Sequence, residues 1–501
     1  MTEKGYTVQK GAFEFFTQDR CQELQNCFAN NPSSPYGITF LPAGPFENVA
    51  TYPLWEKILR TEVDGVSMSG TYRLDPRETV ITIGQTPPRC LYYSYLPYVF
   101  DRYYPFGWSS TGSGPTKCPT VTDARGGRCT LFASLGNPIN MLTINSSREN
   151  GQSFNSEFAY FMSGDMDQVK YMQKMSEEAG IAPSIHNTFG LSTQRVNLGL
   201  TPISDGFSHL LRFVFGENQD EFNEYIKNPS EYVTILRVTP PAGQSEGSPF
   251  TPPVFKERVS TPESVLSKGL TNQALKMGLN GELKRGILEK YVLQYPFVNS
   301  FTLNAPSFDN GYDCMDRGTK CNGDIQDTLY PNSLKAVTEG KICSKLLGEL
   351  CPVINRMTLE EDGSDFFIAT GVNHNATKSG LYSSIAMYNL ARLESIGVFN
   401  SMPIEVNSDS YVGSAKQYLR NRSVSEYLFA VKITRKCEEG ESFCLEISKT
   451  GPNSLPINGS CLFIERIYMD ELKAGPSRDA TIKPIIYHFS KKRFSTSRVE
   501  Y

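Results

Sequence analysis

The stretch Val80-Ile-Thr-Ile-Gly84-Gln-Thr-Pro-Pro88 is an extended apolar run that stops at a glycine turn, and Phe367-Ile-Ala-Thr-Gly371 repeats this pattern later in the chain. The runs that follow the two turns contain a matching set of residues: Tyr93, Ser94 and Tyr98, and Tyr382, Ser383 and Tyr388. β-Branched and aromatic residues on both sides of a glycine turn are typical of two paired strands. The repeat predicts two similar β-sandwich halves derived from one unit. The alternative is coincidence, because hairpins with a glycine turn are common.

The rest of the sequence predicts a β-rich α+β protein with two β-sandwich or jelly-roll-like halves and several helices packed at their edges. Short β-branched and aromatic runs predict strands at 80–83, 92–100, 129–134, 141–144, 234–238, 366–370, 381–388, 427–434, 444–447, 462–467 and 485–489. Apolar periodicity and capping residues predict helices at 18–28 and 166–179, within 206–227, from Glu263 to about 291, and near 414–419.

A change of composition marks the middle of the chain. Residues 242–253 are rich in Gly, Ser, Pro and Thr, which is typical of a linker. We therefore expect an N-terminal β-rich half at 1–241, a linker and helical connection at 242–300, and a disulfide-rich C-terminal β half at 301–501.

The cysteines indicate an oxidising compartment. Ten of the twelve form five close pairs: Cys21 and Cys27, Cys118 and Cys129, Cys314 and Cys321, Cys343 and Cys351, and Cys437 and Cys444. Zinc sites usually show Cys-x-x-Cys spacing or Cys/His clusters, and this chain has no Cys-x-x-Cys and only four histidines. We expect disulfides and a secreted or lumenal protein, with Cys90 and Cys461 either joined or left as free buried thiols. A cytosolic protein with reduced thiols is the alternative.

The bulk composition excludes some partners. The formal net charge is -4 and no long run of basic residues occurs, so nucleic acid is not an expected partner. No apolar stretch is long enough to cross a bilayer. The first residues lack the layout of a signal peptide, so an exported form would have lost its signal. Four glycosylation sequons begin at Asn145, Asn375, Asn421 and Asn458, about as many as chance supplies.

One short motif resembles a known family. Asp324-Ile-Gln-Asp-Thr-Leu-Tyr-Pro331, together with Gly70-Thr-Tyr-Arg-Leu74 and Pro87-Pro88, is similar to the Asn-x-Asp-Thr-Leu-Tyr signature of a bacterial family of unknown function. The order of the motifs differs from that of the family. The resemblance implies a fold of two jelly-roll-like β modules and implies no reaction.

An acidic segment from 309 to 327 is the first candidate site. A bridge between Cys314 and Cys321 would crowd its carboxylates, and crowded carboxylates bind Ca²⁺ or shift each other's pKa. The predicted metal ligands are Asp313, Asp316 and Asp324. The alternative is a solvated loop that uses Asp, Asn and Gly for turns.

His374 is the second candidate, because it follows a strand at a glycine turn and imidazole is suited to general acid/base chemistry near neutral pH. Tyr382 on the returning strand and Asp327 of the acidic segment are its predicted catalytic partners. The alternative is an ordinary turn histidine.

The third candidate is the aromatic run from Tyr92 to Trp108. Exposed aromatic faces stack on sugars or flat ligands, whereas buried ones fill a core. The predicted ligand-binding residues are Tyr93, Tyr95, Tyr98, Arg102 and Trp108. Core packing of these rings is the alternative.

Two functions follow from these candidates. The first is an extracytoplasmic enzyme, a hydrolase or lyase, that acts on a small organic or carbohydrate-like substrate by general acid/base chemistry. The second is a secreted β-sandwich protein that binds a ligand or partner without catalysis. No nucleotide cofactor is expected, because Gly-x-Gly-x-x-Gly and P-loop motifs are missing. The sequence does not decide haem or flavin binding, or the oligomeric state.

Overall fold

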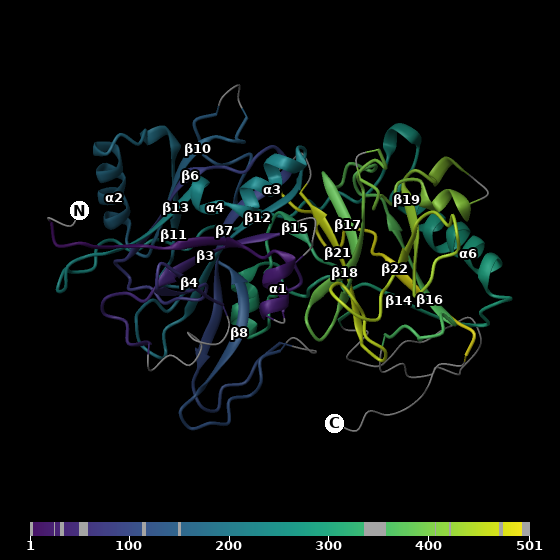
Figure 1. Cartoon of the computed structure of the whole chain (residues 1–501), viewed down its shortest axis with the longest axis horizontal. Coiled ribbons are helices and arrows are strands. Elements are labelled where there is room, and N and C mark those ends of the chain that lie inside the picture. Colours follow the sequence, from purple (N-terminus) through teal and green to yellow (C-terminus); the bar gives the residue numbers. More distant parts are fainter. Residues whose placement is uncertain are drawn as a thin grey trace. The chain divides into compact units, whose positions relative to one another are not determined.

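The computed structural model divides the chain into two compact units (Figure 1). The first unit contains residues 1–20, 32–256 and 308–325, and the second contains 21–31, 257–307 and 326–501. The residues whose structure is described are 4–24, 26–30, 35–49, 59–112, 117–148, 152–334, 357–405, 407–419, 422–469 and 474–492. The main boundary at 256/257 lies just after the predicted linker. Segments 21–31 and 308–325 differ from the predicted halves, because no local pattern shows on which unit a loop packs.

The first unit is a sandwich of two sheets. Its five-stranded sheet has the order β1 (Thr7–Lys10), β13 (Val233–Thr239), β6 (Thr79–Gln85), β10 (Glu157–Ser163) and β11 (His186–Gly190). Its eight-stranded sheet has the order β4 (Arg60–Val63), β5 (Val66–Ser69), β3 (Tyr36–Pro42), β12 (Gly206–Gly216), β7 (Cys90–Tyr104) and β8 (Gly127–Ser134), with β2 (Ala12–Phe15) on β3 and β9 (Ile139–Asn140) on β7. Rings from both sheets meet between them, as where Tyr160 of β10 stacks on His209 of β12 at 4.8 Å.

The second unit has the same architecture with fewer strands. Its five-stranded sheet has the order β14 (Phe297–Thr302), β22 (Ile485–Ser490), β16 (Asp365–Val372), β19 (Leu428–Thr434) and β20 (Cys444–Glu446). Its four-stranded sheet has the order β15 (Thr328–Leu329), β21 (Cys461–Tyr468), β17 (Tyr382–Asn389) and β18 (Glu394–Asn400). Phe367 of β16 and Phe463 of β21 pack edge to face at 5.3 Å inside a fully buried core cluster.

The two units are topological copies. Nine strands correspond in both chain order and sheet position: β1 to β14, β3 to β15, β6 to β16, β7 to β17, β8 to β18, β10 to β19, β11 to β20, β12 to β21, and β13 to β22. The parallel pairs also correspond, because β10 pairs with β11 and β19 pairs with β20 in parallel. This agreement confirms the internal duplication that the repeated glycine-turn pattern predicted.

The repeated glycines occupy the same place in the two sheets. Gly84 lies opposite Phe158 of β10, and Gly371 lies opposite Phe429 of β19. A Cβ atom on Gly84 would lie 2.0 Å from the carbonyl oxygen of Tyr232. Both glycines lie within strands, and β6 and β7, like β16 and β17, belong to different sheets, so the predicted pairing of strands across a glycine turn was wrong. Close approach of the neighbouring backbone explains the glycine at position 84.

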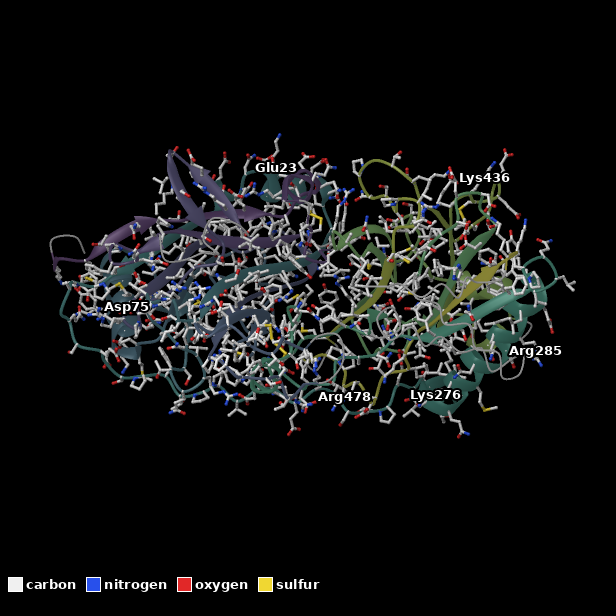
Figure 2. All side chains as sticks on the ribbon, turned by 90° about the horizontal axis from the view of Figure 1, so that it is seen from below. Glu23, Asp75, Lys276, Arg285, Lys436 and Arg478 are labelled. Atoms are coloured by element: carbon white, nitrogen blue, oxygen red, sulfur yellow. A yellow bond between two sulfur atoms is a disulfide. The ribbon has the colours of Figure 1, made fainter. Side chains whose placement is uncertain are left out.

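Helices cover the outer faces of the five-stranded sheets. In the first unit α2 (Met166–Glu178) packs on this face, followed in the chain by α3 (Gln219–Lys227) and α4 (Pro229–Tyr232). In the second unit a helical segment runs through α5 (Asn272–Met277), a π-helical turn (Gly278–Leu283) and α6 (Lys284–Tyr291). Its apolar side packs on β16 and β22, while Lys276 and Arg285 point outward (Figure 2). Shorter helices are α1 (Gln18–Leu24), α7 (Gly311–Arg317) and single 3₁₀ turns at Pro183–Ile185, Leu266–Lys268, Ser414–Gln417 and Arg422–Val424.

Three sequence-based assignments were wrong in part. The first half of 206–227 is the strand β12, which is buried on both faces and therefore lacks the alternation that marks a strand. Residues 141–144 form a turn closed by bonds to the carbonyl of Asn140. Glu263 lies outside any helix, because the α-helix begins later, at Asn272 after the N-cap Thr271.

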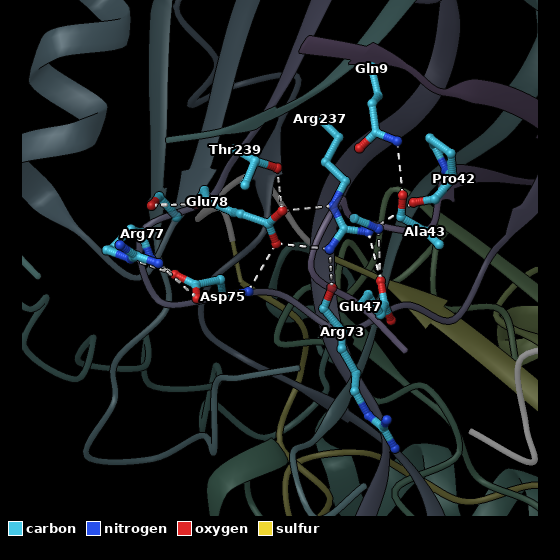
Figure 3. Close-up of polar contacts among 12 residues, drawn as sticks. Gln9, Pro42, Ala43, Glu47, Arg73, Asp75, Arg77, Glu78, Arg237 and Thr239 are labelled. Carbon is cyan, nitrogen blue, oxygen red and sulfur yellow. Dashed lines mark hydrogen bonds and ion pairs between the residues drawn. The ribbon is translucent and has the colours of Figure 1, made fainter. Parts of the chain in front are cut away.

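A buried ion-pair network lies at one edge of the first unit's core (Figure 3). Arg237 of β13 donates to both carboxylate oxygens of Glu78, at 3.0 and 2.8 Å, and to Glu47 at 3.0 Å. All three side chains have no exposed surface. The second unit keeps a histidine–carboxylate pair at the matching positions, where Nε2 of His488 and Oδ2 of Asp365 are 2.7 Å apart.

Four disulfides join described residues: Cys21 to Cys27, Cys118 to Cys129, Cys314 to Cys321, and Cys437 to Cys444. These confirm four of the five expected pairs, and Cys343 and Cys351 lie outside the described residues. Cys90 and Cys461 are free and buried, as one of the two alternatives expected. No helix within the described ranges has the length and apolarity required to span a bilayer.

We predict that replacing Arg237 with Leu destabilises the protein by about 3–5 kcal/mol, because two buried carboxylates lose their cation. The matched control is Arg89→Leu, which removes a half-exposed pair with Glu217 and should cost less than about 1 kcal/mol. Urea unfolding measures both values. Equal losses for the two variants would contradict the buried network.

We also predict that Cys90 and Cys461 resist alkylation in the native protein, because burial raises the pKa of both thiols and blocks access. Both should react after unfolding without reductant. Mass mapping of labelled peptides measures this, and rapid labelling of native protein would show that the thiols are accessible.

Candidate functional site

The His374 side chain points into the second unit from a tight loop after β16. The loop is closed by backbone bonds from Ser379 and Gly380 to the carbonyl of His374, at 3.0 and 3.2 Å. The side-chain amide of Asn375 donates to the carbonyl of Leu381 at 2.7 Å and closes the loop further. The loop leaves the imidazole with no exposed surface.

Two glutamates hold the imidazole from opposite sides. Nδ1 lies 2.7 Å from Oε1 of Glu263, and Nε2 lies 3.2 Å from Oε1 of Glu465, both within hydrogen-bond distance. Glu465 lies in the middle of β21, and Glu263 lies in the segment that precedes α5. Both carboxylate side chains are about 1% exposed, so the three groups form a fully buried cluster.

Glu263 has the richer set of partners. Its Oε1 also accepts bonds from the hydroxyls of Thr377 and Ser379, each at 2.7 Å. Its Oε2 accepts the backbone N–H of Ile482 at 3.3 Å. Oε2 of Glu465, in contrast, is buried and has no hydrogen-bond partner among the described residues. The cluster is therefore asymmetric, because only the Glu263 carboxylate has hydrogen-bond partners on both of its oxygens.

The charges follow from this asymmetry. Burial by itself would lower the pKa of His374, but attraction by Glu263 and Glu465 raises it to about 10. Burial raises the pKa of Glu263, and the bonds from His374, Thr377 and Ser379 outweigh this effect and lower it. Burial dominates at Glu465 and raises its pKa. At neutral pH the cluster is an imidazolium paired with the Glu263 carboxylate, so neither ring nitrogen has a lone pair for a general base.

The predicted catalytic partners do not bond His374. Within the described part of the chain the imidazole contacts Glu263, Glu465 and Ser379, and neither Tyr382 nor Asp327. Tyr382 and Asp327 are themselves fully buried, and the Tyr382 ring packs against Tyr468. The sequence held a signal for Glu465, because a charged residue in the middle of an apolar strand run requires a buried partner.

The predicted aromatic wall is mostly core. Tyr93, Tyr95 and Tyr98 have no exposed surface, so none of these rings forms an exposed wall; Tyr95 packs between the sheets, and Tyr98 lies beside Arg212 on the other face. Arg102 is bound to Asp205 through two bonds of 3.0 and 2.7 Å. Trp108 stacks on Tyr104 at 3.7 Å. The exposed ring of this run is Phe106 at the β7–β8 loop, with 64% of its surface accessible.

The predicted metal ligands have separate partners in the first unit. Asp313 pairs with Arg317 at 2.8 Å, and Asp316 pairs with Arg195 at 2.8 Å. Asp324 accepts from the backbone and hydroxyl of Ser134 at 2.9 and 2.6 Å. In the described ranges these three carboxylates do not form a cluster of metal-ligand geometry. The group that has this spacing is Cys437, Glu441 and Cys444, and its two sulfurs are joined as a disulfide.

Comparisons with known proteins give no family. No family model matches the chain, and no curated protein matches it. The chain is similar in structure to an uncharacterised protein from Burkholderia cenocepacia, with a TM-score of 0.36, 9% identity, and coverage of 96% of this chain and 82% of that one. It is also similar to a protein from Vibrio parahaemolyticus, with a TM-score of 0.34, 9% identity, and coverage of 82% and 86%. Likenesses at this level carry no argument about function.

We predict that the stability supplied by His374 falls as pH rises from 6.5 toward about 10. The pKa of the imidazole is raised in the folded state, so its contribution is complete below the unfolded value of 6.5 and is lost near the folded value of about 10. The difference in unfolding free energy between wild type and His374→Gln, measured by denaturant titration across this range, should therefore shrink.

His186→Gln is the control for this experiment. His186 bonds the Ser176 hydroxyl, and burial lowers its pKa, so it is neutral in both states above pH 7. The difference in unfolding free energy between wild type and His186→Gln should stay constant over the alkaline range. If the difference in unfolding free energy between wild type and His374→Gln also stays constant over this range, that result would contradict the buried imidazolium.

Proposed function

We propose that this protein is a secreted β-sandwich protein that binds a small-molecule or carbohydrate-like ligand and performs no catalysis. The observation that carries this proposal is the closed state of His374, whose two ring nitrogens are both occupied by buried carboxylates. A general base needs an accessible lone pair near the substrate. The enzyme alternative would require this cluster to open and exchange its proton.

The disulfides support the secreted location in this proposal. Four bridges join described residues, and persistent disulfides are typical of oxidising compartments. Both units have large buried cores, so the bridges tighten loops rather than replace a core.

The exposed ring of Phe106 is the proposed ligand contact. It lies in the β7–β8 loop beside Trp108, which stacks on Tyr104, and a bridge joins Cys118 of the same loop to Cys129 of β8. Binding residues are often found on loops held by a rigid scaffold. An exposed ring on an anchored loop offers a flat face at little entropic cost.

The function is tested by screening small molecules and oligosaccharides against the native protein with two readouts. A ligand should raise the melting temperature, because it binds the folded state, and mass spectrometry should detect no conversion of that ligand. The matched variants are His374→Gln and His488→Gln, which each remove a buried histidine–carboxylate pair from the second unit. Conversion that disappears in His374→Gln and persists in His488→Gln would establish the enzyme alternative.

We predict that Phe106→Ala weakens binding of such a ligand roughly twofold to tenfold, the effect of losing about 0.5–1.5 kcal/mol of aromatic contact. The control is Phe46→Ala, which removes another ring of the same unit that is 53% exposed. Calorimetry measures the affinity, and both variants should keep the wild-type melting temperature. Equal affinity for the two variants would remove Phe106 from the binding site.

A further inference from the structure

Each unit buries an arginine on the outer face of one sheet, the eight-stranded sheet in the first unit and the four-stranded sheet in the second. Arg212 of β12 lies over the rings of Tyr36 and Tyr98, at 5.1 and 5.0 Å, and donates to the Tyr98 hydroxyl. Both strands beside β12 therefore contribute a tyrosine to it. The guanidinium is buried, so each of its donors needs an acceptor.

The second unit repeats this arrangement at the matching positions. Arg466 of β21 lies over the rings of Tyr330 and Tyr388, at 5.8 and 5.4 Å, and donates to the Tyr388 hydroxyl. Ser94 lies opposite Arg212, and Ser384 lies opposite Arg466. Ser94 therefore corresponds to Ser384, one residue after the Ser383 expected from the sequence, and Tyr98 corresponds to Tyr388 as expected.

A disulfide-closed loop supplies an acceptor to this arginine in both units. Nη2 of Arg212 donates to the carbonyl of Gly323 at 2.8 Å, and Nη2 of Arg466 donates to the carbonyl of Ala29. Each carbonyl lies two residues after the second cysteine of a bridge, Cys314 to Cys321 in one case and Cys21 to Cys27 in the other.

The two loops also dock by the same backbone bonds. Gly323 donates to the carbonyl of Phe132 at 2.8 Å, and Ala29 donates to the carbonyl of Leu393 at 2.9 Å. Phe132 and Leu393 both have left-handed backbones, with φ of 54° and 47°. Such a conformation is uncommon for bulky residues, so its occurrence at both docking points shows that the loops are equivalent.

The chain positions of the two loops are reciprocal. Residues 21–31 lie between β2 and β3 of the first unit, yet they belong to the second unit. Residues 308–325 lie between β14 and β15 of the second unit, yet they belong to the first. Since β3 corresponds to β15, each half of the chain gives its loop to the copy of the fold formed by the other half.

In each unit a buried arginine and two tyrosines form one surface, which we call the Tyr-Arg-Tyr face: Arg212 with Tyr36 and Tyr98, and Arg466 with Tyr330 and Tyr388. We propose that this face of each unit is a docking surface for the cysteine-closed loop of the other half of the same chain. The surface recognises a rigid loop that presents a backbone carbonyl to a buried guanidinium. The disulfide fixes the loop before docking, which lowers the entropic cost of binding. The chain is thus a covalently linked, loop-exchanged pair of sandwiches.

Exchange is tested in the full chain with a specific protease site inserted between Lys256 and Glu257, the unit boundary. The variant Ala29→Cys/Leu393→Cys places a cysteine on the loop and on its docking strand, on opposite sides of the cut. After native cleavage, a non-reducing denaturing gel should show the two fragments joined, and peptide mapping should find the bond between positions 29 and 393. The described native disulfides each lie within one fragment, so the parent protein should separate.

The matched control is Ala29→Cys/Phe132→Cys, which would form a bond only if the loop packed on its own half. Its fragments should separate with no bond between positions 29 and 132. Failure of the first variant to join the fragments overturns the proposal, and so does a bond in the control. A covalent dimer of the uncleaved first variant would also overturn it, because the loop would then belong to a second copy.

Discussion

The structure depends on the two buried guanidinium groups of Arg212 and Arg466. A guanidinium has five donors and cannot be neutralised by losing its proton, so burying it requires acceptors on every side. Tyrosines of the neighbouring strands supply ring faces and a hydroxyl, and a loop carbonyl accepts a further bond in each unit. That carbonyl comes from the other half of the chain, so each unit contains segments from both halves.

The remaining buried charges follow the same rule within each unit. Arg237 is neutralised by two glutamates, and His374 is held by another two. Breaking a buried pair is costly, whereas the net gain from forming one is small, so such groups favour one fold over its alternatives more than they add stability. In the second unit both ring nitrogens of His374 lie against buried carboxylates, an arrangement that supports our binding proposal over the enzyme alternative.

The sequence predicted the β-rich architecture, but it did not show which residues contact the predicted site residues. The strand patterns at 80–83 and 367–371 indicated the duplication, since apolar strand runs are local signals, although both glycines lie within strands and not at turns. The strand β12 was hidden, because a strand buried on both faces shows no alternation. Tyr93, Tyr95 and Tyr98 had the composition of a ligand wall, and only tertiary packing buries them, Tyr95 against Tyr160 between the sheets and Tyr98 beside Arg212 on the other face.

Long-range partners account for the remaining differences. Glu263 and Glu465 are 202 residues apart in sequence, and nothing near either residue shows that both bind one imidazole. The sequence also does not show to which unit segments 21–31 and 308–325 belong, because a short helix with a close cysteine pair folds locally whichever sheet it covers. These features are set by tertiary packing, and sequence patterns within one element carry no information on them.

The most direct test of this account is a nitrogen NMR titration of the His374 side chain, assigned by comparison with His374→Gln. The account predicts an imidazolium that keeps both protons at neutral pH, exchanges them slowly with water and titrates near pH 10. An imidazole that titrates near 6.5 and exchanges its protons rapidly would contradict the closed cluster and restore His374 as a candidate general base.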